Sequence, residues 1–176
     1  MDDHFTLGET AMRISLAAIA LLMSAAGAWA QTPTVSEAKV TLVGTIDAQV
    51  TGKVAAPGVV SDAVNHGTYH FLTNATTMEA RKGLNFGFQY RLIGSPDGAK
   101  VAIRKVTIFP ASGVRNPKTG EILTRDDYIE MNTLGQPGLK AYTIDNDWEA
   151  VPGDWVQQIW FGEQKLAEQT FTLTKP

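Results

Sequence analysis

The sequence predicts an all-β fold in which two antiparallel sheets pack face to face. Residues 84–92 alternate between apolar and polar side chains, which is the period of a half-buried strand. Residues 153–173 have the pattern of a closing hairpin, and turn sequences rich in Pro and Gly separate the extended segments. These features predict an immunoglobulin-like antiparallel β-sandwich of about seven strands after an N-terminal signal peptide. An antiparallel barrel is the main rival fold.

Residues 1–30 are predicted to hold an upstream extension and a secretory signal peptide. Arg13 supplies a positive charge, Ile14 to Met23 is apolar, and Ala28-Trp29-Ala30 is a small-x-small cleavage sequence. The apolar run is too short to favour a membrane span. We therefore expect the protein to be periplasmic or secreted, with no membrane span after cleavage.

The first eleven residues do not fit the start of an export signal. They include Asp2, Asp3 and Glu9, whereas export signals begin with basic residues. We therefore expect Met12 to be the true start and the upstream residues to come from an over-long reading frame.

The mature chain is expected to begin with a short leader followed by one domain. Residues 31–39 are polar and are expected to be a flexible leader, and the β-sandwich domain is expected over residues 40–176. Alternation from Val40 to Val50 predicts the first strand, and Thr68 to Thr73 a weaker one. The segment 74–83 fits either a strand or one helical turn.

The middle of the chain contains the strand with the clearest alternation. Its apolar face consists of Leu84, Phe86, Phe88, Tyr90 and Leu92. The next strand, Val101 to Phe109, changes apolar parity, which predicts a bulge near Arg104 and Lys105. A long polar connection then leads to an extended segment from Leu139 to Asp145.

The closing hairpin carries large side chains on both of its faces. Trp155 and Ile159 share the parity that we assign to the core, whereas Trp160 lies on the other parity beside Val156. Either a long loop or residues 31–39 cover Trp160, or Trp160 contacts a partner, because aromatic side chains dominate interface energetics. Trp160 and Val156 are therefore the candidate partner contact.

The composition excludes several classes of function. The formal net charge is -3 and no run of Lys or Arg resembles a phosphate-binding surface, so no nucleic-acid partner is expected. Cysteine is absent, which excludes disulfides, thiolate metal sites and a cysteine nucleophile. The sequence has no phosphate-binding glycine pattern and no G-x-S-x-G nucleophile motif.

Three segments of the chain resemble a known family. They read "LNFGFQYRL", "FPASGVRNPKTG" and "DWEAVPGDWVQQIWFGEQKLAEQTFTL". They are similar to an exported bacterial family called domain of unknown function 3859, over about Val40 to Leu173. The resemblance implies one exported domain of β-sandwich type with a closing hairpin. It implies no activity and no functional residues.

His66 and His70 are the only histidines of the mature chain. On a helix these two positions would converge on one metal ion, but the surrounding residues are strand-like. Along a strand the two residues are roughly 13 Å apart, at about 3.3 Å per residue. We therefore favour surface histidines over a metal pair.

The acidic residues give no clear calcium site. Asp145, Asp147 and Glu149 are closely spaced, but the central glycine and the further ligands of a calcium loop are missing. Asp126 and Asp127 form a separate pair. Solvated loop carboxylates explain both groups, so no metal, cofactor or catalytic residue is assigned.

These observations predict a non-catalytic exported module that binds a cell-envelope protein or a glycan. The alternative is a hydrolase or a metal-dependent enzyme with a site assembled from dispersed residues, such as His66, His70, Asp145 and Asp147. Convergence of these side chains on one point in the fold would favour the enzyme, and their dispersal would favour the binding module.

The signal sequence predicts cleavage after Ala30. Mass spectrometry of the exported product should find Gln31, free or cyclised, at the N-terminus, because Ala28 and Ala30 provide the small side chains that cleavage requires. Recovery of the full-length chain from the cytoplasm would contradict export.

Overall fold

The computed structural model describes residues 31–55, 59–60 and 63–176. The expected signal peptide, its cleavage site and the proposed start at Met12 lie outside the described residues. Among the residues that are described, no helix is long and apolar enough to cross a membrane.

The described chain is built almost entirely from strands. The elements are β1 (Thr34–Ala55), β2 (Ala63–Phe71), β3 (Thr77–Glu79), β4 (Asn85–Ser95), β5 (Lys100–Ile108), β6 (Val114–Arg115), β7 (Ile122–Leu123), β8 (Arg125–Thr133), β9 (Pro137–Thr143), the 3-10 helix η1 (Asp147–Glu149), β10 (Gly153–Phe161) and β11 (Gln164–Thr174). The segment 74–83, which was open to two interpretations, contains the short strand β3.

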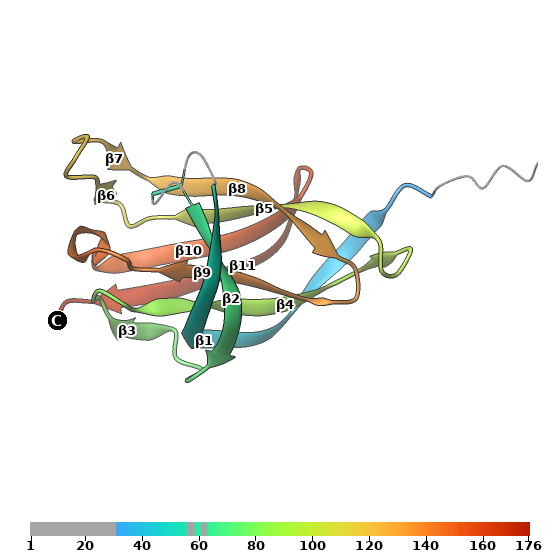
Figure 1. Ribbon diagram of the computed structural model, residues 1–176, viewed down its shortest axis with the longest axis horizontal. Coiled ribbons are helices and arrows are strands. Elements are labelled where there is room, and N and C mark those ends of the chain that lie inside the picture. The colour runs from blue at the N-terminus through green and yellow to red at the C-terminus, as the bar shows by residue number, and fades with distance from the viewer. Residues whose placement is uncertain (1–30, 56–58, 61–62) are drawn as a thin grey trace, which may run out of the picture. The chain divides into compact units, whose positions relative to one another are not determined.

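The strands form two main sheets that enclose the core (Figure 1). The first sheet has the order β2-β1-β4-β9, and the second has the order β3-β11-β10-β5-β8. The short strands β6 and β7 pair separately. The prediction of an all-β, immunoglobulin-like sandwich is therefore confirmed, with β3, β6, β7 and β8 as strands that the sequence pattern did not reveal.

Strand β4 provides the centre of the core. The side chains of Phe86, Phe88 and Tyr90 are fully buried, and the Phe86 ring lies 5.8 Å from Trp155 and 5.1 Å from Phe171 in the second sheet. Strands β1 and β9 pair with the two edges of β4. The apolar alternation of β4 therefore predicted its buried face correctly.

The expectation of a flexible leader at residues 31–39 is wrong from Thr34 onward. Strand β1 begins at Thr34, and its first residues pair with the end of β4 from Ser95 back to Arg91. Val35 and Ala38 are buried in the core. The segment looks polar because its other side chains face solvent, while the edge of β4 still requires a backbone partner.

Strand β1 changes partner along its length. Its first part pairs with β4 as far as Thr45, and its second part pairs with β2 from Ile46 onward. Gly44, at the change, has φ 144°, and a Cβ there would lie 1.9 Å from the carbonyl oxygen of Thr73. Residues 46–55 and β2 together form a hairpin arm, which runs across the other strands in Figure 1.

The expected bulge near Arg104 and Lys105 is absent. Strand β5 pairs with β8 and β10 without a register shift. Lys105 and Thr107 occupy inward positions in phase with Ile103, and both are buried. Val106, on the opposite face, is also buried. The apolar side chains therefore change face along β5 without any bulge, which is why the sequence pattern suggested one.

The long polar connection contains β8, an edge strand that the sequence pattern concealed. In the pairing of β8 with β5, Asp126 lies opposite Thr107 and Tyr128 lies opposite Lys105. Glu130 lies opposite Ile103. Polar side chains thus occupy inward positions of β8, so the usual apolar alternation is missing. This polar part of the interior is where the candidate site lies.

Replacing Phe88 by alanine should destabilise the protein by roughly 3–5 kcal/mol, because the buried ring leaves a cavity in close-packed surroundings. Urea denaturation measures the change. Ile129→Ala is the matched control, since Ile129 is 70% exposed, and it should cost less than about 0.5 kcal/mol. A loss below about 1 kcal/mol for Phe88→Ala would contradict the assigned core.

Candidate functional site

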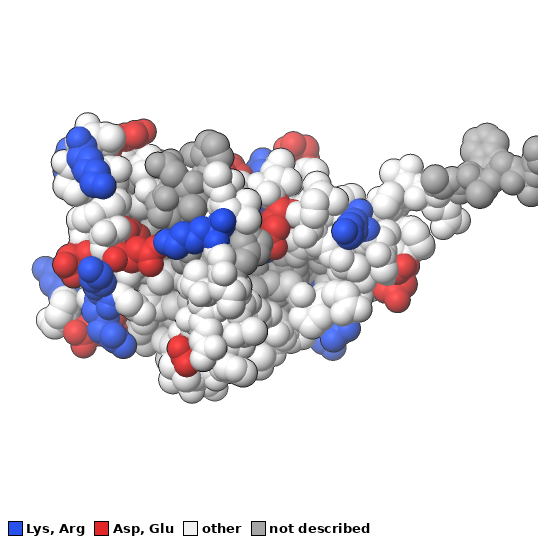
Figure 2. Space-filling model, in the orientation of Figure 1, with Lys and Arg blue, Asp and Glu red and all other residues white. Residues whose placement is uncertain are grey.

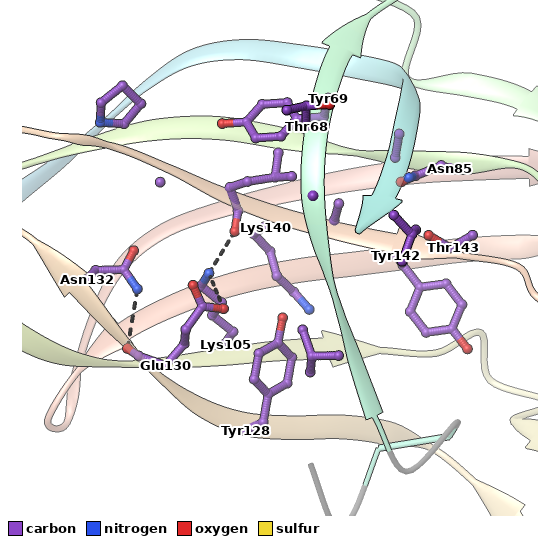
Figure 3. A pocket seen from close by; sticks show the side chains of 18 of the residues that line it. Thr68, Tyr69, Asn85, Lys105, Tyr128, Glu130, Asn132, Lys140, Tyr142 and Thr143 are labelled. Atoms are coloured by element: carbon purple, nitrogen blue, oxygen red, sulfur yellow. Dashed lines mark hydrogen bonds and ion pairs between the residues drawn. The ribbon is translucent and has the colours of Figure 1, made fainter. Parts of the chain in front are cut away.

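A cavity lies at the open side of the sandwich, where the hairpin arm meets β8 and β9 (Figure 3). Its volume is about 400 Å³, within the range of small-molecule binding sites. The arm contributes Gln49, Thr68 and Tyr69, β4 contributes Asn85, and β5, β8 and β9 supply most of the charged side chains. The change of partner in β1 therefore helps to form this cavity, because it directs the arm away from β4.

Lys105 of β5 is a buried lysine whose charge is compensated locally. Its Nζ donates to the carbonyl oxygen of Leu139 at 2.7 Å and lies 2.9 Å from Oε2 of Glu130. Figure 3 shows these interactions as dashed lines at the base of the cavity. Lys105 is 2% exposed, whereas the side chain of Glu130 is about one-third exposed, so the pair joins the interior to the cavity surface.

Lys140 of β9 is a second buried lysine, and its surroundings differ. It is 1% exposed, and its Nζ donates to Oγ1 of Thr107 at 2.6 Å. The ammonium also lies 5.2 Å from the centre of the Tyr128 ring, which is a cation–π distance. Within the described part of the chain, no carboxylate forms an ion pair with Lys140.

Burial changes the acid–base properties of these groups. Loss of hydration lowers the pKa of Lys140 to about 7, an effect that Asp126 opposes and Lys105 reinforces. Burial lowers the pKa of Lys105 as well, although Glu130 opposes the change. Near neutral pH, the ammonium and the neutral amine of Lys140 are therefore both populated.

The predicted pair Asp126–Asp127 is divided between the two faces of β8. Asp126 is 5% exposed, and its Oδ1 accepts a hydrogen bond from the Val60 N–H at 2.8 Å. Burial raises the pKa of Asp126 to about 6, while Lys140 and the Val60 N–H oppose the rise. Asp127 faces outward and pairs with Arg125 at 2.6 Å.

Hydroxyl and amide groups make up much of the remaining lining. The Tyr90 hydroxyl, behind the lining, donates to Oδ1 of Asn132 at 2.7 Å. Burial raises the pKa of Tyr90 and of Tyr128, so both remain neutral hydroxyl groups at physiological pH. Oδ1 of Asn85 is buried without a hydrogen-bond partner. A ligand that donates hydrogen bonds would satisfy that oxygen.

The face shown in Figure 2 has no continuous basic surface of the kind that binds a polyanion. On the face shown in Figure 2, charged side chains of both signs are scattered over an uncharged surface. The polar character of the cavity therefore comes from its lining and not from a general surface potential.

The described residues of the alternative enzyme hypothesis are not gathered into a metal site. His70 is an exposed residue of β2, Asp147 is exposed in η1, and Asp145 is half-buried at the cavity. Glu149 is buried and accepts hydrogen bonds from Tyr142 and Asn146. Among the described side chains, no group of three or more His, Asp or Glu could hold a metal ion. The side chain of His66 lies outside the described residues.

The candidate partner contact at Trp160 and Val156 lies on the outer face of β10. Both side chains are half-buried. The guanidinium of Arg104 lies 5.0 Å from the centre of the Trp160 ring, and the Trp160 Nε1 donates to Gln158 at 2.9 Å. Arg104, a neighbouring side chain of the same sheet, thus covers part of the ring. Binding of a partner at this surface stays a prediction.

Sequence reasoning missed the residues that dominate the cavity. Lys105 and Lys140 line the cavity from inward positions of strands, where apolar residues are usual, and the buried Thr107 lies behind them as the acceptor of Lys140. The available signal was the apparent change of parity in β5. It indicated polar side chains inside a continuous strand, not a bulge in the strand.

The fold and the cavity define an immunoglobulin-like sandwich protein with a polar internal pocket. The chain belongs to the family described as Domain of unknown function (DUF3859), whose sequence profile matches residues 46–173. This match confirms the resemblance that the sequence motifs indicated. No curated protein matches the chain.

Solved structures support the fold. An immunoglobulin-like protein from Pseudomonas aeruginosa is similar with a TM-score of 0.54 and 20% identity, over 79% of this chain and 98% of the other. At that identity the similarity shows the fold alone. A β-D-glucoside glucohydrolase from Trichoderma reesei has a TM-score of 0.33 and 13% identity, over 81% of this chain and 19% of the enzyme, which is too low to support an argument.

The free energy of unfolding should rise between about pH 7 and pH 10. In this range the unfolded chain protonates Lys140, whereas the folded protein, with a pKa of about 7, does not. The unfolded state therefore binds more protons, and stability increases by up to about 1.4 kcal/mol per pH unit. Asp126, with a pKa of about 6, is largely ionised above pH 7. The buried tyrosines oppose the rise only towards pH 10, where they begin to lose protons in the unfolded chain.

Urea denaturation at several pH values measures this slope. Lys140→Met should reduce it, leaving the contribution of Lys105, whose pKa burial also lowers, while the exposed Lys118→Met should preserve it. An unchanged slope in Lys140→Met would show that the buried amine is not the source.

Proposed function

We propose that this protein is an exported, non-catalytic binding module of the cell envelope, and that its cavity binds a glycan. The observation that carries the proposal is the polar cavity of about 400 Å³ between the hairpin arm, β8 and β9. Export rests on the signal sequence that ends at Ala30, and it places the module in the periplasm or outside the cell.

The lining favours a small hydroxyl-rich ligand over a protein partner. Protein interfaces are broad surfaces with an apolar centre, whereas this site is concave and is lined by hydroxyl, amide, ammonium and carboxylate groups together with apolar side chains. Tyr69 and Tyr128 add aromatic rings, and Asn85 adds an acceptor without a partner. These groups suit a sugar, which has hydroxyl groups at its edges and an apolar face.

Binding requires no group beyond those that line the cavity. An enzyme would need a nucleophile, an acid–base pair or a metal ion in contact with its substrate. In the part of the chain that the structure describes, no group of three or more His, Asp or Glu could hold a metal ion, and His70 and Asp147 are exposed. Lys140 and Asp126 could exchange protons at the cavity, but no nucleophile is identified beside them among the described residues. We therefore propose binding without catalysis.

Filling the cavity should abolish glycan binding. Thr68 lines the cavity from the exposed strand β2, so Thr68→Trp adds a ring at the site without disturbing the core. Saturation-transfer NMR of the exported protein with soluble envelope glycan fragments should detect binding that Thr68→Trp weakens at least about tenfold.

Thr170→Trp is the matched control, because Thr170 is exposed on β11 outside the cavity. This variant should bind as the unaltered protein does. Equal binding by Thr68→Trp would place the glycan elsewhere, and the absence of glycan binding in the unaltered protein would reject the proposed function.

A further inference from the structure

We infer that the glycan is acidic and that the ammonium of Lys140 binds its carboxylate. This inference rests on the proposed function and specifies its ligand class as a sugar acid. The geometric basis is a buried lysine at the cavity that makes no ion pair with the described carboxylates.

The comparison with Lys105 carries the argument. Both lysines line the same cavity and both are almost fully buried. Lys105 has a carboxylate at 2.9 Å and a carbonyl acceptor at 2.7 Å, which compensate its charge. Lys140 has one neutral acceptor, the Thr107 hydroxyl, at 2.6 Å. An ammonium donates three hydrogen bonds, so Lys140 retains capacity for a further acceptor.

The charges around Lys140 come from strands on each side of the cavity. Asp126, Asp127 and Glu130 of β8 attract the ammonium, whereas Lys105 of β5 repels it. Glu130 is already paired with Lys105, and Asp127 with Arg125. Asp126 therefore remains as the main attractive charge, without direct contact. A ligand carboxylate in contact with Nζ would provide the ion pair that the chain does not.

The other polar groups of the cavity indicate a sugar framework for that carboxylate. Oδ1 of Asn85 is buried without a donor, and a sugar hydroxyl can supply one. Tyr128 holds its ring against Lys140 and presents a neutral hydroxyl at the cavity (Figure 3). A free inorganic anion would make no hydrogen bond with Asn85 or Tyr128. A sugar acid could pair its carboxylate with the ammonium of Lys140 and form hydrogen bonds with these two residues through its hydroxyl groups.

Binding of a carboxylate should also be linked to protonation of Lys140. The free amine must take up a proton before it pairs with the anion, because the pKa of Lys140 is about 7 in the free protein. Affinity should therefore be greatest below pH 7 and fall by up to about tenfold per pH unit above it. Protonation of Asp126, with a pKa of about 6, removes a competing carboxylate and acts in the same direction.

Isothermal titration calorimetry with two matched pairs of sugars tests the inference. Glucuronate is compared with glucose, and N-acetylmuramate with N-acetylglucosamine, using the exported protein near pH 6.5. The acid of at least one pair should bind at least about tenfold more tightly than its neutral partner. Lys140→Met should remove that preference, and the exposed Lys118→Met should preserve it.

A second measurement covers the case in which Lys140→Met fails to fold. The unaltered protein is titrated with the preferred acid in buffers of different ionisation enthalpy near pH 8, where binding should take up a proton. Equal affinity for acid and neutral sugars, or acid binding without proton uptake, would overturn the inference and leave the proposed function standing. Failure of all four sugars to bind would overturn both.

Discussion

Contact between the aromatic faces of the two sheets holds this domain together. The chain has no cysteine, so no disulfide joins the sheets as it does in antibody domains. Phe86 of β4 instead lies against Trp155 and Phe171 of the opposite sheet, with Tyr142 and Phe109 completing the cluster. Each of these rings removes a large apolar area from water, and their edge-to-face arrangement adds to the stabilisation.

The interior changes from apolar to polar towards β8 and β9. In β5, the inward side chains progress from Ile103 to Lys105 and Thr107. Two buried lysines are costly for a domain of this size, because each loses its hydration on folding. A core made for stability alone would carry apolar residues at these positions. Polar residues at these inward positions lower the stability of the fold, and they are the kind of residues that an internal binding site requires.

The hairpin arm connects the stable part of the fold to the cavity. It continues the same strand, β1, that pairs with the central strand β4, so its base is anchored in the core. From Ile46 onward it pairs with β2 alone and supplies cavity residues such as Gln49 and Tyr69. A hydrogen bond from the N–H of Val60, which lies between the two strands of the arm, to Asp126 joins the arm to the edge strand β8 of the second sheet. The first sheet thus provides one wall of the cavity through the arm. Most of the charged groups of the cavity come from β5 and β8 of the second sheet.

The sequence by itself determined the fold class, because alternation in β4 and in the closing hairpin follows directly from strand geometry. It also determined which faces of these two elements are buried, as Phe88 and Trp155 show. Only the tertiary structure revealed β8 and the site, since the polar residues of β5, β8 and β9 are far apart in sequence. The contacts that these residues make depend on which strands are neighbours. Lys105 pairs with Glu130 because β5 and β8 are adjacent in one sheet, and Lys140 meets Thr107 because β9 of the first sheet packs against β5 of the second. A strand pattern fixes the direction of a side chain, but the partner that it meets there is decided by the packing of the sheets.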